Sequence, residues 1–116
     1  MKTPSSSSYI KFLNLANAIR NLTIFPFINP MEERLLNYVA IAWQSDKRLN
    51  ISETMHSDIG MSPSSVHRHL KSLRAKGYLC LTVDDLDSRI KYISNTPLSA
   101  EYFSMLGQCI SETVIS

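Results

Sequence analysis

After residue 8, three dipeptides in this sequence place a helix-capping residue directly before a proline: Asn29-Pro30, Ser62-Pro63 and Thr96-Pro97. The side chains of Asn, Ser and Thr accept hydrogen bonds from the free N–H groups at a helix start. Proline suits the next position because its fixed φ is helical and no N–H donor is needed there. Each dipeptide therefore predicts the start of a helix. The predicted helices cover residues 30–44, 63–76 and 97–114.

Two further helical segments complete the predicted set. Residues 9–22 are apolar on more than one face, so we expect this helix to contact both its own core and a second subunit. A short helix capped by Asn50 or Ser52 is expected to end at Gly60, since glycine readily adopts the left-handed conformation found at helix C-termini. The serine-rich residues 1–8 are expected to form a flexible tail.

Two short apolar segments after Gly77, residues 78–83 and 90–94, are separated by an acidic turn and predict a β-hairpin. A short helix, a turn, a longer helix and a hairpin, in that order, are typical of a winged helix-turn-helix. The predicted fold class is therefore mainly α with a small β-hairpin wing. At this chain length we expect a single winged-helix domain over residues 9–116.

Charge, cysteine content and the absence of known catalytic motifs limit the functions that this chain is expected to have. A net charge of +2 and a pI of about 8.6 do not by themselves indicate a nucleic-acid partner. The sequence has two cysteines, no signal peptide and no apolar run of membrane length, so we expect a cytoplasmic protein with no membrane partner. It also lacks a glycine-rich phosphate loop, a nucleophile elbow and metal-ligand spacing. We therefore expect no catalytic residues, no cofactor and no metal site.

The predicted helix 63–76 has two unlike faces. At 100° per residue, Val66, Leu70 and Leu73 fall on one side. The opposite side and its flanks carry hydroxyl and basic groups, and no acid occurs anywhere in this helix. Such a surface donates hydrogen bonds to phosphates and base edges without a repelling carboxylate. The residues of this segment that we expect to bind DNA are Ser62, Ser64, Ser65, His67, Arg68 and Lys71.

The stretches SPSSVHRHLKSLRAKGYL and DDLDSRIKYISNTPLSAEYF resemble the MarR-type winged-helix transcription regulators, and the likeness covers about residues 30–106. Its most specific part is Asp87-Ser88-Arg89, which matches the D-x-R motif of the wing in that family. The resemblance implies that Arg89 enters the minor groove of double-stranded DNA and that Asp87 holds it. Lys91 is expected to assist at phosphates.

Dimerisation is expected because one small module has too little surface for tight, specific DNA binding. Since the last helix is short for this family, the homodimer is expected to use helices 9–22 and 97–114. Its DNA site would then be pseudo-palindromic. An unidentified small-molecule effector is a further possible partner, and a group of aromatic residues could line its pocket. The alternative is that the same residues form the core and the dimer interface. These are Tyr9, Phe12, Phe25, Phe27 and Trp43.

Other interpretations stay open beside this one. The main rival is a winged-helix module that binds a protein rather than DNA, which would expose apolar residues on helix 63–76. A shared metal is disfavoured because His67 and His69 lie about 200° apart on a helix. Redox sensing is disfavoured because no neighbouring feature that would activate the Cys80 or Cys109 thiol is visible in the sequence. The acids at 84 and 85 receive no role beyond ending a strand and solubilising the turn.

Overall fold

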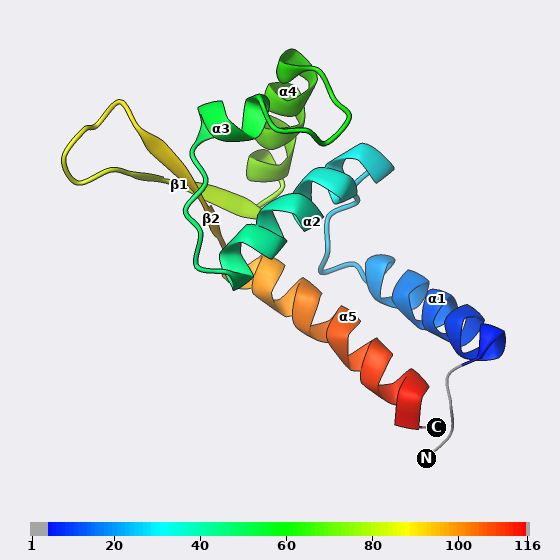
Figure 1. Cartoon of the computed structure of the whole chain (residues 1–116). Coiled ribbons are helices and arrows are strands. Elements are labelled where there is room, and N and C mark those ends of the chain that lie inside the picture. The colour runs from blue at the N-terminus through cyan, green and yellow to red at the C-terminus, as the bar shows by residue number, and fades with distance from the viewer. Residues whose placement is uncertain (1–4, 116) are drawn as a thin grey trace. The chain divides into compact units, whose positions relative to one another are not determined.

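The computed structural model describes residues 5–115 and divides into two compact units (Figure 1). The first unit contains helix α1 (Ser6–Arg20), the segment that follows it up to Phe27, and helix α5 (Pro97–Ile115). The second unit comprises residues 28–96. Its elements are α2 (Pro30–Gln44), α3 (Ile51–Met55), α4 (Pro63–Ala75), β1 (Leu79–Val83) and β2 (Lys91–Asn95). This order confirms the predicted fold class, mainly α with a β-hairpin wing.

The capping residues set where the helices of the second unit begin. The Asn29 side chain accepts a hydrogen bond from the backbone N–H of Glu32 at 2.8 Å, and the Glu32 carboxylate accepts one from the backbone N–H of Asn29. Asn50, rather than Ser52, caps α3 by a similar capping box. Ser62 caps α4, as predicted. These reciprocal bonds satisfy donors that a helix start otherwise leaves free.

Two expected boundaries were wrong. The serines at positions 6–8 belong to α1, because Ser5 caps that helix and accepts a bond from the N–H of Ser8. Residues 1–4, the rest of the expected tail, lie outside the described residues. Helix α3 ends at Met55, well before Gly60, since the Ser57 hydroxyl donates to a carbonyl at the helix end. A run of serines offers a cap wherever a helix can begin, so serine content alone does not distinguish a tail from a capped helix start.

The core of the second unit lies between α2, α4 and the hairpin. The predicted inner face of α4 is confirmed, since Val66 and Leu73 are fully buried and Leu70 is 6% exposed. Burial of each such side chain contributes roughly 1.5–3 kcal/mol. Helix α2 supplies the opposing layer, and the sheet and its flanks supply the rest. The other buried apolar residues of this unit are Leu35, Leu36, Val39, Ala42, Leu49, Tyr78, Leu79 and Ile93.

The hairpin is antiparallel, with Leu79 opposite Asn95 and Val83 opposite Lys91. Its second strand is also tied to the segment before α3, because the backbone N–H of Ile93 donates to the carbonyl of Leu49 at 2.8 Å. The indole N–H of Trp43, on α2, donates to the carbonyl of Ile93 at 3.0 Å. These bonds fix the base of the hairpin to the helical part of its unit.

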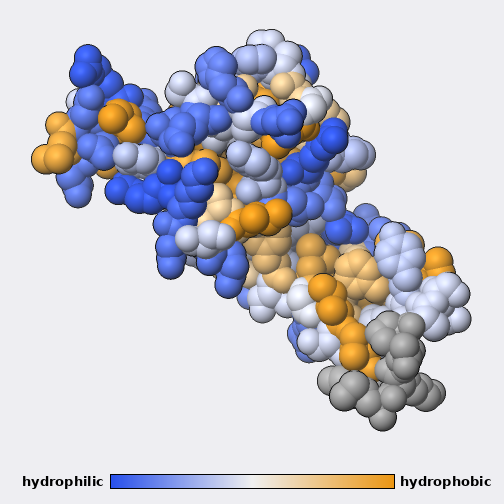
Figure 2. All heavy atoms as spheres, in the orientation of Figure 1, coloured by the Kyte–Doolittle hydropathy of each residue, from blue (hydrophilic) through white to orange (hydrophobic). Residues whose placement is uncertain are grey.

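In the first unit, α1 and α5 pack against each other. Phe25 is buried edge-on against the Tyr102 ring, and the Arg20 guanidinium donates to the Tyr102 hydroxyl. Figure 2 shows exposed hydrophobic side chains along this unit and mostly hydrophilic ones over the second unit. The large apolar residues exposed in the first unit are Tyr9, Ile10, Leu22, Ile24, Phe27, Ile110 and Val114. Within residues 5–115, no helix combines the length and apolarity needed to cross a membrane.

Candidate nucleic-acid interface

The outer face of α4 is polar and carries cations that are unpaired within residues 5–115. Ser64, His67, Arg68 and Lys71 are exposed, whereas His69 is buried and its Nδ1 lies 2.7 Å from the carbonyl of Ser65. The structure shows no hydrogen bond or ion pair for the side chains of His67, Arg68 and Lys71 with any residue it describes. Their hydrogen-bond donors are therefore available to an external partner.

The hydroxyl groups at the start of α4 are partly engaged. Ser62 is exposed, but its Oγ accepts the capping bond from the N–H of Ser65 and lies 3.3 Å from the Oγ of Ser64. Ser65 is half-buried, and its hydroxyl lies 3.4 Å from Nδ1 of His69. Of the three predicted hydroxyl donors, Ser64 is thus the one that is most available. The helix N-terminus itself still favours a negatively charged group.

The wing turn is organised by Asp84, which was expected only to end a strand and solubilise the turn. Its Oδ2 accepts hydrogen bonds at 3.0 Å from the backbone N–H groups of Leu86 and Asp87. The turn is closed by two backbone bonds, from the N–H of Asp84 to the carbonyl of Ile90 and from the N–H of Ile90 to the carbonyl of Asp87. The backbone bonds to the carboxylate lower the pKa of Asp84. An Asp that binds N–H groups two and three positions ahead is a known turn signal and was available in the sequence.

A second contact holds Asp84 from the base of the wing. The hydroxyl of Tyr92, on β2, donates to Oδ1 of Asp84 at 3.1 Å, and this bond raises the pKa of Tyr92. The Arg48 guanidinium carbon lies 3.9 Å from the centre of the Tyr92 ring, within cation–π distance. The turn is therefore connected through two side chains to the loop between α2 and α3.

Asp87 and Arg89 form a two-pronged pair at the wing. Nε and Nη2 of Arg89 donate to the two carboxylate oxygens of Asp87 at 3.0 and 3.1 Å, and the backbone N–H of Arg89 adds a third bond. These bonds lower the pKa of Asp87 and raise that of Arg89. The Arg89 side chain is nevertheless 88% exposed. Asp87 thus orients the Arg89 guanidinium before any partner binds, and the side chain remains accessible to solvent.

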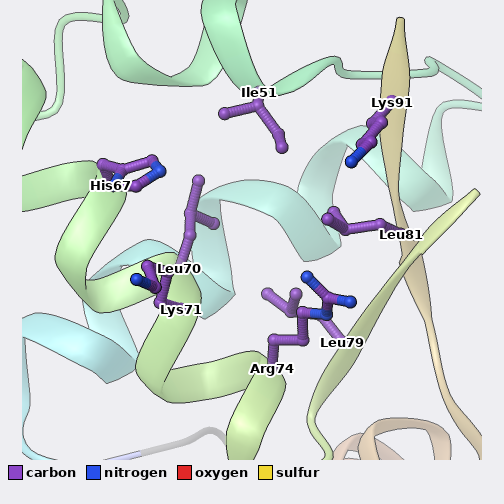
Figure 3. Close-up of a pocket in the computed structure, with 8 residues that line it drawn as sticks. All are labelled: Ile51, His67, Leu70, Lys71, Arg74, Leu79, Leu81 and Lys91. Atoms are coloured by element: carbon purple, nitrogen blue, oxygen red, sulfur yellow. The ribbon is translucent and has the colours of Figure 1, made fainter. Parts of the chain in front are cut away.

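Two cavities connect the wing with the helices. One, of about 240 Å³, lies between α4 and the hairpin and includes His67, Lys71 and Lys91 in its lining (Figure 3). The other, of about 410 Å³, lies between α3 and β2 and includes Arg89 and Lys91. Lys91 lines both cavities, so the cavities are neighbours. Residues of α4 and of the wing that were predicted to bind DNA therefore lie on one continuous surface. Neither lining contains an acidic residue.

Helix α4 is fastened to α2 by a buried carboxylate that the sequence analysis did not single out. Glu32 is 1% exposed and accepts hydrogen bonds from the Ser72 hydroxyl and from Nζ of Lys76, the latter at 2.8 and 2.9 Å. Burial raises the pKa of Glu32, but the bonds from Lys76, Ser72 and Asn29 outweigh it, so the pKa lies below its ordinary value. This cluster ties α4 to α2 on the side of α4 that carries Ser72 and Lys76.

Replacement of Asp84 by alanine is expected to loosen the wing without unfolding the unit. The change removes the acceptor for two backbone N–H groups and for the Tyr92 hydroxyl. Heteronuclear NOE values of residues 86–89 should fall, while those of α4 stay unchanged. Asp84→Asn retains one acceptor oxygen, so its NOE values at residues 86–89 should lie between those of the wild type and those of Asp84→Ala. Unchanged NOE values in Asp84→Ala would show that Asp84 does not order the turn.

No protein-family model and no curated protein matches this chain by sequence. Solved structures do match. The transcriptional regulator Tm0710 of Thermotoga maritima superposes with a TM-score of 0.66 at 17% identity, over 93% of this chain and 68% of its own. A MarR-like regulator of the same organism, Tm0816, gives 0.61 at 15% identity, over 97% and 79%. The heme sensor PefR of Streptococcus agalactiae, in complex with heme, gives 0.60 at 15% identity, over 91% and 66%.

At these identities the comparison concerns architecture. The superpositions cover 91–97% of the chain, so the likeness is not confined to one helix or to the hairpin. The chain therefore has the winged-helix fold of the MarR-type transcriptional regulators.

Proposed function

We propose that this chain is a sequence-specific transcriptional regulator that binds double-stranded DNA as a homodimer, with α4 in the major groove and Arg89 in the minor groove. The observation that carries this proposal is the exposed Arg89 guanidinium, oriented by Asp87 through two side-chain bonds. A narrow minor groove has an enhanced negative potential that attracts arginine. Orientation before binding reduces the side-chain entropy that the arginine loses in the groove.

Helix α4 suits the major groove in this arrangement. Arg68 is exposed and unpaired among the described residues, and an arginine fork matches the O6 and N7 acceptors of guanine. Ser64 and Lys71 lie on the same side and would contact phosphates. We assign the reading of bases to Arg68 and backbone contacts to Ser64, Lys71 and Lys91.

The homodimer is supported by the apolar surface of the first unit. Side chains on both α1 and α5 stay exposed, among them Ile10 at 55% and Ile110 at 54%. Because each α4 would then read one half-site, the two half-sites should lie about one helical turn apart. Since PefR was solved with heme, the proposal includes a small-molecule effector but does not assign its chemistry.

The rival function is a winged-helix module that binds a protein partner. Such a surface needs exposed apolar side chains, but between Ser64 and Arg74 the exposed residues of α4 are serine, histidine, arginine and lysine. The geometry therefore favours DNA.

Selection of bound duplexes from a random pool tests the proposed function. We expect an enriched site with two inverted halves and an affinity that falls steeply with salt, as counterion release requires. Arg68→Ala should weaken binding to this site and relax the preference at one base pair in each half. Lys47→Gln serves as a control, since it removes one charge from the turn after α2, outside both cavities. Failure of the folded protein to enrich any duplex would contradict DNA recognition.

A further inference from the structure

The cavity between α4 and the hairpin has an apolar floor and a cationic rim. Leu70, Leu79 and Leu81 form much of the floor, together with Ile51 of α3. Figure 3 shows Lys71 and Arg74 on α4 and Lys91 on β2 around the same space. Two elements, α4 and β2, thus place three cations at one cavity. Arg74 was not among the residues expected to bind DNA.

These cations have no partner among the residues that the structure describes. For the side chains of Lys71, Arg74 and Lys91 the structure shows no hydrogen bond or ion pair within residues 5–115. Lys76, two positions after Arg74, differs because it is paired with the buried Glu32. With no acid in its lining, the cavity has an uncompensated positive charge of about three. The imidazole of His67 adds a hydrogen-bonding group at its edge.

An anion at this position would be held firmly. The apolar floor lowers the local dielectric constant, which strengthens an ion pair relative to one on an open surface. The planar Arg74 fork matches two oxygens of a phosphate, and the lysines add point charges. A cavity of about 240 Å³ has room for a phosphate group and several waters, each of which occupies roughly 30 Å³ in the liquid.

We infer that this cavity is a phosphate seat, in which Arg74, Lys71 and Lys91 hold one backbone phosphate of the bound DNA. The seat rests on the proposed function and deepens it. It lies beside the face of α4 that carries Arg68, and Lys91 joins it to the cavity lined by Arg89. One phosphate held between helix and wing would fix the distance between the major-groove and minor-groove contacts.

Duplexes with one methylphosphonate linkage per half-site test the seat, because this linkage removes the charge of a single phosphate. Scanned along the selected site, the wild-type protein should lose about tenfold in affinity at the phosphate between the two groove contacts. In Arg74→Gln the unmodified duplex should bind more weakly by a similar factor, with a salt slope lower by about one. In Arg74→Gln, a methylphosphonate at that position should lower the affinity only slightly further. In Arg74→Lys, the methylphosphonate should cause part of the affinity loss that it causes in the wild type.

The outcomes separate the seat from the proposed function. The seat is wrong, while DNA binding stands, if the Arg74→Gln variant gives the same methylphosphonate profile as the wild type. The same conclusion follows if Arg74→Gln binds the unmodified duplex with wild-type affinity. Lys47→Gln should leave the methylphosphonate profile unchanged. If no duplex is bound but inorganic phosphate shifts the NMR signals of the Arg74 and Lys71 side chains, the cavity takes free phosphate and the DNA source is overturned. If neither duplex nor inorganic phosphate is bound, both proposals fail.

Discussion

Replacement of Arg89 by alanine is expected to lower the affinity for the selected duplex by about 10- to 150-fold. Loss of a hydrogen bond to a charged group costs roughly 1.5–3 kcal/mol, which corresponds to this range. The melting temperature should not change, because the side chain is 88% exposed and its ion-pair partner Asp87 is also accessible. Fluorescence anisotropy of a labelled duplex at two salt concentrations measures the effect.

Two matched variants show whether orientation matters as well as charge. Arg89→Lys retains the positive charge but loses the two-pronged bond to Asp87, so its affinity should be intermediate. Asp87→Ala leaves the arginine in place without its acceptor, so affinity should fall less than in Arg89→Ala. Wild-type affinity in a folded Arg89→Ala protein would exclude the wing from the interface.

Replacement of Glu32 by alanine is expected to lower the free energy of unfolding of the second unit by about 3 kcal/mol. Removal of one partner from a buried ion pair leaves the other uncompensated, which typically costs about 3–5 kcal/mol. We take the lower end because the Lys76 side chain is 29% exposed and can reach water. The change also removes the carboxylate that accepts from Asn29 and Ser72. Urea denaturation followed by circular dichroism measures the loss.

The pH dependence of stability in wild type and in a Glu32→Gln variant tests whether the charge of Glu32 is what stabilises the second unit. The folded pKa of Glu32 lies below its ordinary value of 4.5, so its stabilising contribution is present above that pH and disappears as pH falls through the lowered pKa. The stability difference between wild type and Glu32→Gln should therefore shrink in acid. Asp58→Asn, an exposed control, should show little difference at any pH. A constant difference between wild type and Glu32→Gln down to acid would mean that the ionised carboxylate is not what stabilises α4.

Local signals in the sequence were sufficient to predict most of the fold. The capping residues Asn29 and Ser62 act on N–H groups within three positions, so their patterns are visible without a structure. The buried face of α4 follows from helical periodicity alone. Turn and helix ends were predicted less well, because several polar residues compete for the same backbone groups. The serines before α1 and the early end of α3 are examples.

The candidate site was predictable only where a motif lies within a few residues. Asp87 and Arg89 are two positions apart, whereas Glu32 and Lys76 are separated by 44 positions and meet only after α2 and α4 have packed. Tyr92 meets Arg48 for the same reason. Arg74 was missed because it acquires its surroundings from the hairpin, which follows it in the chain. Long-range partners need the tertiary fold before their chemistry is visible.

The bond from the Trp43 indole to the Ile93 carbonyl has a practical consequence for folding experiments. Trp43 is the only tryptophan in the chain, and both residues belong to the unit of residues 28–96. Tryptophan fluorescence, excited selectively, therefore follows the loosening of this unit alone, whereas far-ultraviolet ellipticity sums the helices of both units. Coincident denaturation midpoints from the two signals would indicate that the chain unfolds in one cooperative step, and separated midpoints that each unit melts by itself.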